Sequence, residues 1–419
     1  MRILAIGSKL ELGDLYLSLM RDGHEVRVSA WDPAYAGVFD GLVTKVPDWK
    51  PELDWVGRDG LVLFERVGDG AEQDALRAQG YQVLGGSALG DRLEYDRAFG
   101  QSVLRDAGLR TAPAYSFASP PEAGRWLEAQ PGRFVLKYHN NARASFVGDD
   151  DAGRDVQFQL RRGPQGPVML MPRLEGVEIG VGAYFDGNHF LRPACIDFEH
   201  KRFFNGEMGE MTGEMGTLVA YPAENRLFEA TLARVEPLFR DAGHVGYVNL
   251  NTIVNEEGVW PLEFTCRFGI PGYAILAPLQ QAGWGDLLER MMRGGAERFP
   301  ASTDWSVGIV LTIPPFPEEL PGADPAADPP VFYRQVPEGD ELLHYHLHDV
   351  RLEDGQLLAR RRTGYVMCVT GTGPTVTGAQ EAAVARARNV VAPNLRWRTD
   401  IGDRFLQGEG ERLRRMGWL

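Results

Sequence analysis

The chain has few cysteines and no long hydrophobic run. Its 419 residues contain three cysteines, Cys195, Cys266 and Cys368, which lie far apart and in no metal-ligand spacing. Reduced thiols in a cytoplasmic protein are the simplest interpretation. No stretch reaches the roughly 18 consecutive apolar residues of a membrane-spanning helix. The start MRILAIG lacks the long apolar segment of a secretion signal, so we expect neither a secreted nor a membrane protein.

Positive charge is also scarce. The chain has 44 lysines and arginines against 58 aspartates and glutamates, which gives a formal net charge of −14. A nucleic-acid-binding surface needs clustered basic residues, so nucleic acid is not an expected partner. A local pocket can still oppose the overall charge, so an anionic small molecule is not excluded.

The order of the predicted elements indicates several domains. A chain of this length holds two to four domains at roughly 100–200 residues each. Strands expected at residues 2–6, 24–31 and 60–64 alternate with helices at 12–22 and 69–79, which is typical of a parallel sheet with crossover helices. We therefore expect an α/β domain over residues 1–95.

The rest of the chain is rich in strands. Expected strands span residues 133–137, 168–171, 177–185, 193–198, 245–254, 259–264, 305–313, 341–350, 356–360 and 365–370. Expected helices span residues 95–107, 225–242 and 379–391, and the proline-rich stretch 314–330 is expected to be a loop. The fold class is thus α/β and α+β in several domains.

Four polar segments follow apolar strands in an order that suits a nucleotide. Lys137 ends one strand and can reach phosphate oxygens, and Glu178 can accept from ribose hydroxyls. The glycine-rich residues 209–216 permit close approach of a ligand. Glu263 can hold Mg²⁺, and Arg267 can stabilise charge on a phosphoryl group. Each alone has an ordinary explanation, such as a solvated lysine or a structural ion pair, and only their order favours a shared nucleotide site.

These segments resemble the phosphoribosylamine–glycine ligase family of ATP-grasp enzymes over nearly the whole chain. The matching stretches include FVLK at 134–137 for "vvK", EHKR at 199–202 for "DhKR", TGEMG at 212–216 for "TGGMG", LEFTCRFG at 262–269 for "lEFN-RFG" and RTDIG at 398–402 for "RrDIG". The resemblance implies an ATP-grasp fold with a Rossmann-like N-terminal domain (1–95), a core (96–300) that includes a lid at about 111–172, and a small β-rich C-terminal domain (301–419).

The resemblance also implies a site and a reaction. ATP and Mg²⁺ or Mn²⁺ would serve a carboxylate–amine ligase that acts on small molecules as a monomer or homodimer. Arg97 and Lys137 would contact ATP phosphates, and Lys201 and Arg267 would stabilise an acyl phosphate. The remaining roles would be adenine binding by Met171, Pro172, Arg173 and Leu174, ribose binding by Glu178, substrate binding by Thr212, Gly213 and Gly216, and metal binding by Glu263, Thr265 and Asn251.

Several positions depart from the family pattern. The loop "GGREHA", which cradles the sugar phosphate in the family, is SKLELG here at residues 8–13. Thr265 replaces a metal-binding Asn, "FGDPE" has become FGIPG at 268–272, and the glycine-rich loop after the lysine is YHNNAR at 138–143. We therefore expect an amine other than phosphoribosylamine.

Two alternatives stay open: the orthodox glycine ligase of purine synthesis, and a nucleotide-binding protein without catalysis. His344, His346 and His348 alternate, so a metal site on a strand is a further possibility, although a structural or substrate-rim role is favoured.

Overall fold

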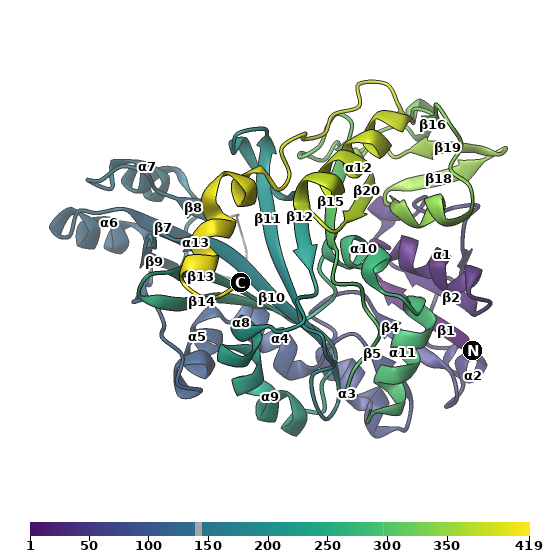
Figure 1. Cartoon of the computed structure of the whole chain (residues 1–419), viewed down its shortest axis with the longest axis horizontal. Coiled ribbons are helices and arrows are strands. Elements are labelled where there is room, and N and C mark those ends of the chain that lie inside the picture. The colour runs from purple at the N-terminus through teal and green to yellow at the C-terminus, as the bar shows by residue number, and fades with distance from the viewer. Residues whose placement is uncertain (139–144, 296) are drawn as a thin grey trace.

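The computed structural model describes residues 1–138, 145–295 and 297–419. Its elements fall into an N-terminal unit, a small lid unit and a large mixed body, and Figure 1 shows the first two at opposite ends of the long axis. Within the described ranges, no helix is both long and apolar enough to cross a membrane.

The N-terminal unit is the parallel α/β sheet that the sequence predicted. Its five strands run in the order β3-β2-β1-β4-β5, and every pairing is parallel. Short apolar strands such as LVLF are buried on both faces, as expected where helices cover both sides of a sheet. The elements are β1 (Arg2–Gly7), α1 (Gly13–Arg21), β2 (Glu25–Ala30), β3 (Thr44–Lys45), α2 (Leu53–Val56), β4 (Leu61–Phe64), α3 (Gly70–Ala78) and β5 (Gln82–Leu84).

The lid unit is a four-stranded antiparallel sheet in the order β6-β9-β7-β8. It has a hydrophobic cluster of its own, which includes Leu127, Leu136 and Leu170. Helices α4 (Ala88–Tyr95) and α5 (Arg97–Asp106) precede it, and its elements are β6 (Tyr115–Phe117), α6 (Pro120–Ala129), β7 (Phe134–Tyr138), β8 (Phe146–Val147), α7 (Arg154–Arg162) and β9 (Val168–Pro172).

The body is built on an eight-stranded sheet in the order β14-β13-β10-β11-β12-β15-β20-β17. Strands from the last third of the chain therefore complete a sheet that begins in the middle third, and the expected division at residue 300 stays a prediction. The strands are β10 (Val177–Asp186), β11 (Cys195–Phe204), β12 (Met208–Ala220), β13 (Val245–Asn255), β14 (Gly258–Thr265), β15 (Trp305–Thr312), β17 (Tyr345–Leu347) and β20 (Tyr365–Gly373).

Helices and small ribbons cover this sheet. They are α8 (Arg226–Ala230), α9 (Leu232–Asp241), α10 (Gly272–Leu276), α11 (Gly283–Arg293), α12 (Val376–Asn389) and α13 (Gly410–Arg415), with β16 (Phe332–Tyr333) paired to β21 (Val390–Val391) and β18 (Val350–Glu353) paired to β19 (Gln356–Ala359).

Two expected elements were wrong in detail. The single helix expected over 225–242 is split at Thr231, whose hydroxyl donates to Leu227 O at 2.6 Å and so competes with the backbone ladder. The strand expected over 341–350 begins only at Tyr345, because residues Gly339–His344 form a 3₁₀ helix.

Candidate active site

Charged side chains from three separate elements meet at Glu263. Its carboxylate contacts Arg97 from α5 and lies 3.4 Å from Lys137 Nζ at the end of β7. Burial opposes ionisation of Glu263, but Lys137, Arg97 and Lys201 outweigh it and hold its pKa well below the ordinary range. Burial lowers the pKa of the Lys137 ammonium, and Glu263 opposes that shift. The arrangement places one carboxylate in contact with two basic side chains.

Lys201 on β11 joins a second group of charges. Its Nζ lies 2.7 Å from Glu199 Oε2 and 3.0 Å from Glu178 Oε1, while the Asn251 amide donates to both carboxylates. Burial acts against the Lys201 charge, yet Glu199, Glu178 and Glu263 hold its pKa above the ordinary value. Lys201 therefore stays cationic beside the Glu263 group.

A cavity of about 210 Å³ opens beside these charges. Residues in register across four strands form one row of its wall, with Glu263 opposite Asn251, Asn251 opposite Gly180 and Gly180 opposite Asp197. The cavity is lined by Cys195, Asp197, Glu199, Lys201, Gly213, Glu214, Thr217, Val219, Tyr247, Asn249, Asn251, Glu263, Thr265, Arg267, Gly269, Ile270, Gly272 and Leu276.

Two glycines on the central strand β10 make room for this wall. A Cβ on Gly180 would lie 2.1 Å from Asp197 Oδ1, and one on Gly182 would lie 1.8 Å from the Tyr247 hydroxyl oxygen. Side chains from both neighbouring strands therefore lean over β10, and any larger residue there would push them away.

Two carboxyl groups of the cavity have raised pKa values. Burial and the nearby Glu199 charge raise the pKa of Asp197 to about 7, although Asn249 donates a hydrogen bond to its Oδ2 at 2.7 Å. Burial, with Glu199 and Asp197, also raises the pKa of Glu214 well above its ordinary value. Perturbed carboxyl groups in a cavity are typical of functional sites.

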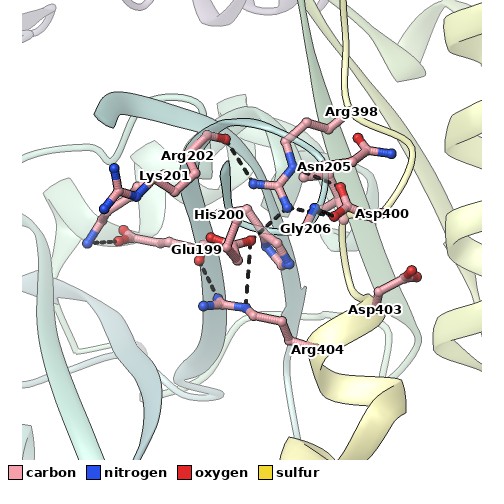
Figure 2. A network of polar contacts seen from close by, with 12 residues as sticks. Glu199, His200, Lys201, Arg202, Asn205, Gly206, Arg398, Asp400, Asp403 and Arg404 are labelled. Atoms are coloured by element: carbon pink, nitrogen blue, oxygen red, sulfur yellow. Dashed lines mark hydrogen bonds and ion pairs between the residues drawn. The ribbon is translucent and has the colours of Figure 1, made fainter. Parts of the chain in front are cut away.

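The C-terminal motif RTDIG holds the hairpin that carries these residues. Figure 2 shows Arg398 and Arg404 meeting β11 and the turn after it. The buried Arg398 guanidinium donates to Asp400, Glu207 and Arg202 O, and Arg404 donates to Glu199 O at 2.6 Å. The motif, together with Arg404 two residues after it, therefore holds the backbone from Glu199 to Glu207, and neither is part of the cavity lining.

The structure brings many predicted site residues to the two cavities. Gly213, Lys201, Arg267, Glu263, Thr265 and Asn251 line the cavity described above. Arg97 and Lys137 line a neighbouring cavity of about 250 Å³ between α5 and the lid unit. Their individual roles stay predictions.

Other predicted residues lie beside the cavities. Thr212 donates its hydroxyl to Lys201 O, and Gly216 packs against Gly308 O and Ile401. Met171 and Pro172 end strand β9, and Arg173 pairs with Asp149. Leu174 is partly buried, and Glu178 pairs with Lys201. The substrate, adenine and ribose contacts assigned to these residues stay predictions.

Sequence reasoning missed Asp197, Glu214, Thr217 and Tyr247. One signal was available: Cys195, Asp197, Glu199 and Lys201 alternate on one strand, so they share a face. Another was Glu214, which stands where the family motif TGGMG has a glycine.

The three alternating histidines are held separately. His346 Nδ1 lies 2.8 Å from Asp14, His344 hydrogen-bonds Thr370, and His348 stacks on Tyr365 with ring centroids 3.8 Å apart. These contacts support the structural role that the sequence favoured. The departure at residues 139–143 lies outside the described residues.

The chain is similar to known proteins over nearly its whole length. Residues 95–273 match the family model for the ATP-grasp (A) domain of phosphoribosylglycinamide synthetase. A phosphoribosylamine–glycine ligase of Corynebacterium ammoniagenes is 26% identical over 440 residues, which cover 97% of this chain and 99% of that protein. One from Ralstonia nicotianae is 25% identical and covers 97% of this chain and all of that protein.

Solved structures agree on the fold. The phosphoribosylamine–glycine ligase of Thermotoga maritima superposes with a TM-score of 0.73 at 20% identity, covering 96% of this chain and 100% of that one. An N5-carboxyaminoimidazole synthetase from Staphylococcus aureus gives a TM-score of 0.59 at 13% identity, covering 92% and 96%. The chain therefore has the ATP-grasp fold, and it is similar over nearly its whole length to phosphoribosylamine–glycine ligases.

Proposed function

We propose that the protein is an ATP-dependent carboxylate–amine ligase whose amine is not phosphoribosylamine. The γ-phosphoryl group of ATP would pass to a substrate carboxylate and release ADP. An amine would then attack the carbonyl carbon, so that a C–N bond forms, the C–O bond to phosphate breaks, and the nitrogen loses a proton. The protein contributes positioning and charge rather than a covalent nucleophile.

The charged residues fit the nucleotide. Arg97 and Lys137 supply cations for the phosphate oxygens of ATP, and Lys201 and Arg267 line the adjoining cavity, where an acyl phosphate would form. The match of residues 95–273 to an ATP-grasp domain model supports ATP and a divalent metal ion as the expected ligands.

A metal ion at this site would need ligands from the nucleotide as well as from the protein. Among the described residues no group of three His, Cys, Asp or Glu side chains is arranged to hold a metal. Mg²⁺ commonly uses one or two carboxylates together with substrate phosphates, and the ionised Glu263 with Asn251 opposite it suits that mode. A bound Mg²⁺ or Mn²⁺ would neutralise charge on the phosphates, with Glu263 as its main protein ligand.

The N-terminal loop carries the proposal about the amine. The Glu65 side chain fills the space beside Gly7 and accepts from Tyr16 Oη at 2.6 Å and from Leu12 N at 3.4 Å. A helix N-terminus binds phosphate through free backbone N–H groups, but here a carboxyl group already occupies the start of α1. The buried Asp14, paired with His346, adds a second acid in the first turn. A sugar phosphate at this loop would meet acidic groups where it needs donors.

A purified-enzyme assay tests the ligase. ADP release from ATP and Mg²⁺ is measured with a panel of carboxylates and amines. Glu263→Gln should reduce turnover at least about a hundredfold, since it removes the carboxylate that would be the main protein ligand of Mg²⁺. The control, Glu257→Gln, lies on the turn of the same β13–β14 hairpin and should keep normal turnover. If ATP binds without any ADP formation across the panel, the non-catalytic nucleotide-binding protein replaces the ligase.

The orthodox phosphoribosylamine–glycine ligase is the second candidate, because curated relatives of that name match 97% of the chain. Expression in a bacterium that lacks its own glycine ligase and needs purine decides between the two. Growth without purine would overturn the proposal about the amine and leave the ligase chemistry in place. The orthodox reading would also fit the cytoplasmic location and the purine pathway expected from the resemblance.

A further inference from the structure

One wall of the cavity carries three oxygen atoms that lack partners. Asp197 and Glu214 are only 7% and 9% exposed and Thr217 is 2% exposed. In the part of the chain that the structure describes, Asp197 Oδ1, Glu214 Oε1 and Thr217 Oγ1 make no hydrogen bond. All three residues line the cavity beside Lys201. Buried polar atoms are nearly always satisfied, so this wall has the form of a binding surface for a donor.

The other charges of the cavity already have partners. Lys201 pairs with Glu199 and Glu178, and Arg267 pairs with Glu94 at 3.3 Å. Glu263 is held by Arg97 and Lys137. Within the described ranges, no Lys, Arg or His forms an ion pair with Asp197 or Glu214, although the Lys201 charge acts on both from further away. The wall therefore favours a positive charge that the protein does not itself supply.

The recess is also built into the backbone. Gly180 lets Asp197 lean across β10, and Gly182 does the same for Tyr247, whose hydroxyl lies 3.3 Å from Cys195 Sγ. The cavity of about 210 Å³ suits a compact molecule. Glu214 stands where the family motif TGGMG has a glycine, so the carboxyl group at this position departs from that motif.

We propose that Asp197, Glu214 and Thr217 bind a cationic side group of the substrate, so that the substrate is a small carboxylic acid bearing an ammonium or guanidinium group on a short chain. A primary ammonium has three N–H donors, which match the three unpartnered oxygens. The carboxylate of the same molecule would face Lys201 and Arg267. This assignment rests on the proposed ligase function.

A bound cation also explains how two acids can share the wall. Without it, their mutual repulsion and burial favour a proton on one of them. An ammonium group restores the ionised form, and binding then releases a proton. Calorimetric titrations in two buffers of different ionisation enthalpy measure that release directly.

The decisive experiment compares matched ligands by calorimetry in the presence of ADP and Mg²⁺. The compounds 2,4-diaminobutyrate and homoserine differ only in an ammonium against a hydroxyl. Wild-type protein should bind the diamino acid about tenfold or more tightly than homoserine, because charge-assisted hydrogen bonds are the stronger ones. Asp197→Asn and Glu214→Gln, which keep the size of each side chain, should each remove that preference. Glu210→Gln, on the exposed part of β12, should keep it.

The outcomes separate this inference from the ligase function. Equal binding of the two compounds by wild-type protein, or an unchanged preference in both variants, overturns the proposal that this wall binds a cation. Loss of preference in the variants with no ADP formed from any compound supports the wall and counts against the ligase. A shorter pair, 2,3-diaminopropionate and serine, should show the same contrast if the fit is at the wall.

Discussion

Glu65 is a buried carboxyl group whose two oxygens have different surroundings. Oε1 accepts from Tyr16 and Leu12, whereas Oε2 has no partner among the described residues. Burial raises the pKa of Glu65 from 4.5 to about 7. An acid with a raised folded-state pKa binds its proton more tightly in the folded protein, so stability falls as the pH rises from about 4.5 to 7.

Glu65→Gln should therefore stabilise the protein at pH 8 by up to about 3 kcal/mol, the free energy equivalent of that shift. Below pH 4.5 the variant should gain nothing, because the wild-type carboxyl is then protonated in both states. Urea unfolding at pH 5 and pH 8 measures the difference, with the exposed Glu128→Gln as a control. Equal effects at both pH values would contradict the buried-acid argument.

The β11–β12 hairpin depends on an element almost two hundred residues later in the chain. Arg398 is 1% exposed and joins Glu207, Asp400 and Arg202 O, so three contacts are lost together when its side chain is removed. Glu207 keeps partial access to water, which limits the penalty of leaving it unpaired.

Arg398→Ala should destabilise the protein by about 3 kcal/mol, at the lower end of the range for a broken buried ion pair. It should also raise amide hydrogen exchange in residues 197–216 and lower ADP formation more than ATP affinity. Arg412→Ala breaks the exposed pair with Glu256 in the same C-terminal region and should have little effect. Normal exchange in the hairpin of Arg398→Ala would show that the motif does not hold it.

At the scale of the whole molecule, the hydrophobic clusters differ in how much of the chain they draw on. One cluster joins residues as far apart as Ile3 and Cys368, whereas the lid cluster draws all its members from residues 115–170. Hydrogen exchange in increasing urea should show strands β7 and β9 opening at a lower free energy than β1, since fewer contacts hold the lid. One common free energy for all three strands would contradict this.

Local patterns in the sequence predicted the parallel N-terminal sheet and most of the strands, because buried strands and amphipathic helices have distinct periods. The order of Lys137, Glu178 and Glu263 suggested a shared site, and Lys137 does meet Glu263, but their nucleotide contacts stay predictions. The cavity wall was not predicted, since the closeness of Asp197, Glu214 and Thr217 depends on strand register and on two glycines of a third strand. The break at Thr231 depended on a side-chain hydrogen bond that hydrophobic periodicity does not report.

The sheet order has a consequence for synthesis on the ribosome. Strand β12 lies between β11 and β15, and β15 in turn pairs with β20. One of the two strands that hydrogen-bond to β12 is therefore translated more than eighty residues after it. A nascent chain that has emerged only as far as residue 300 would present β12 as a long open edge, a template for wrong pairing. The hairpin that carries Lys201 and Glu214 would gain its Arg398 contacts only near the end of translation. Chaperone demand should therefore be highest while residues 220–305 are being made.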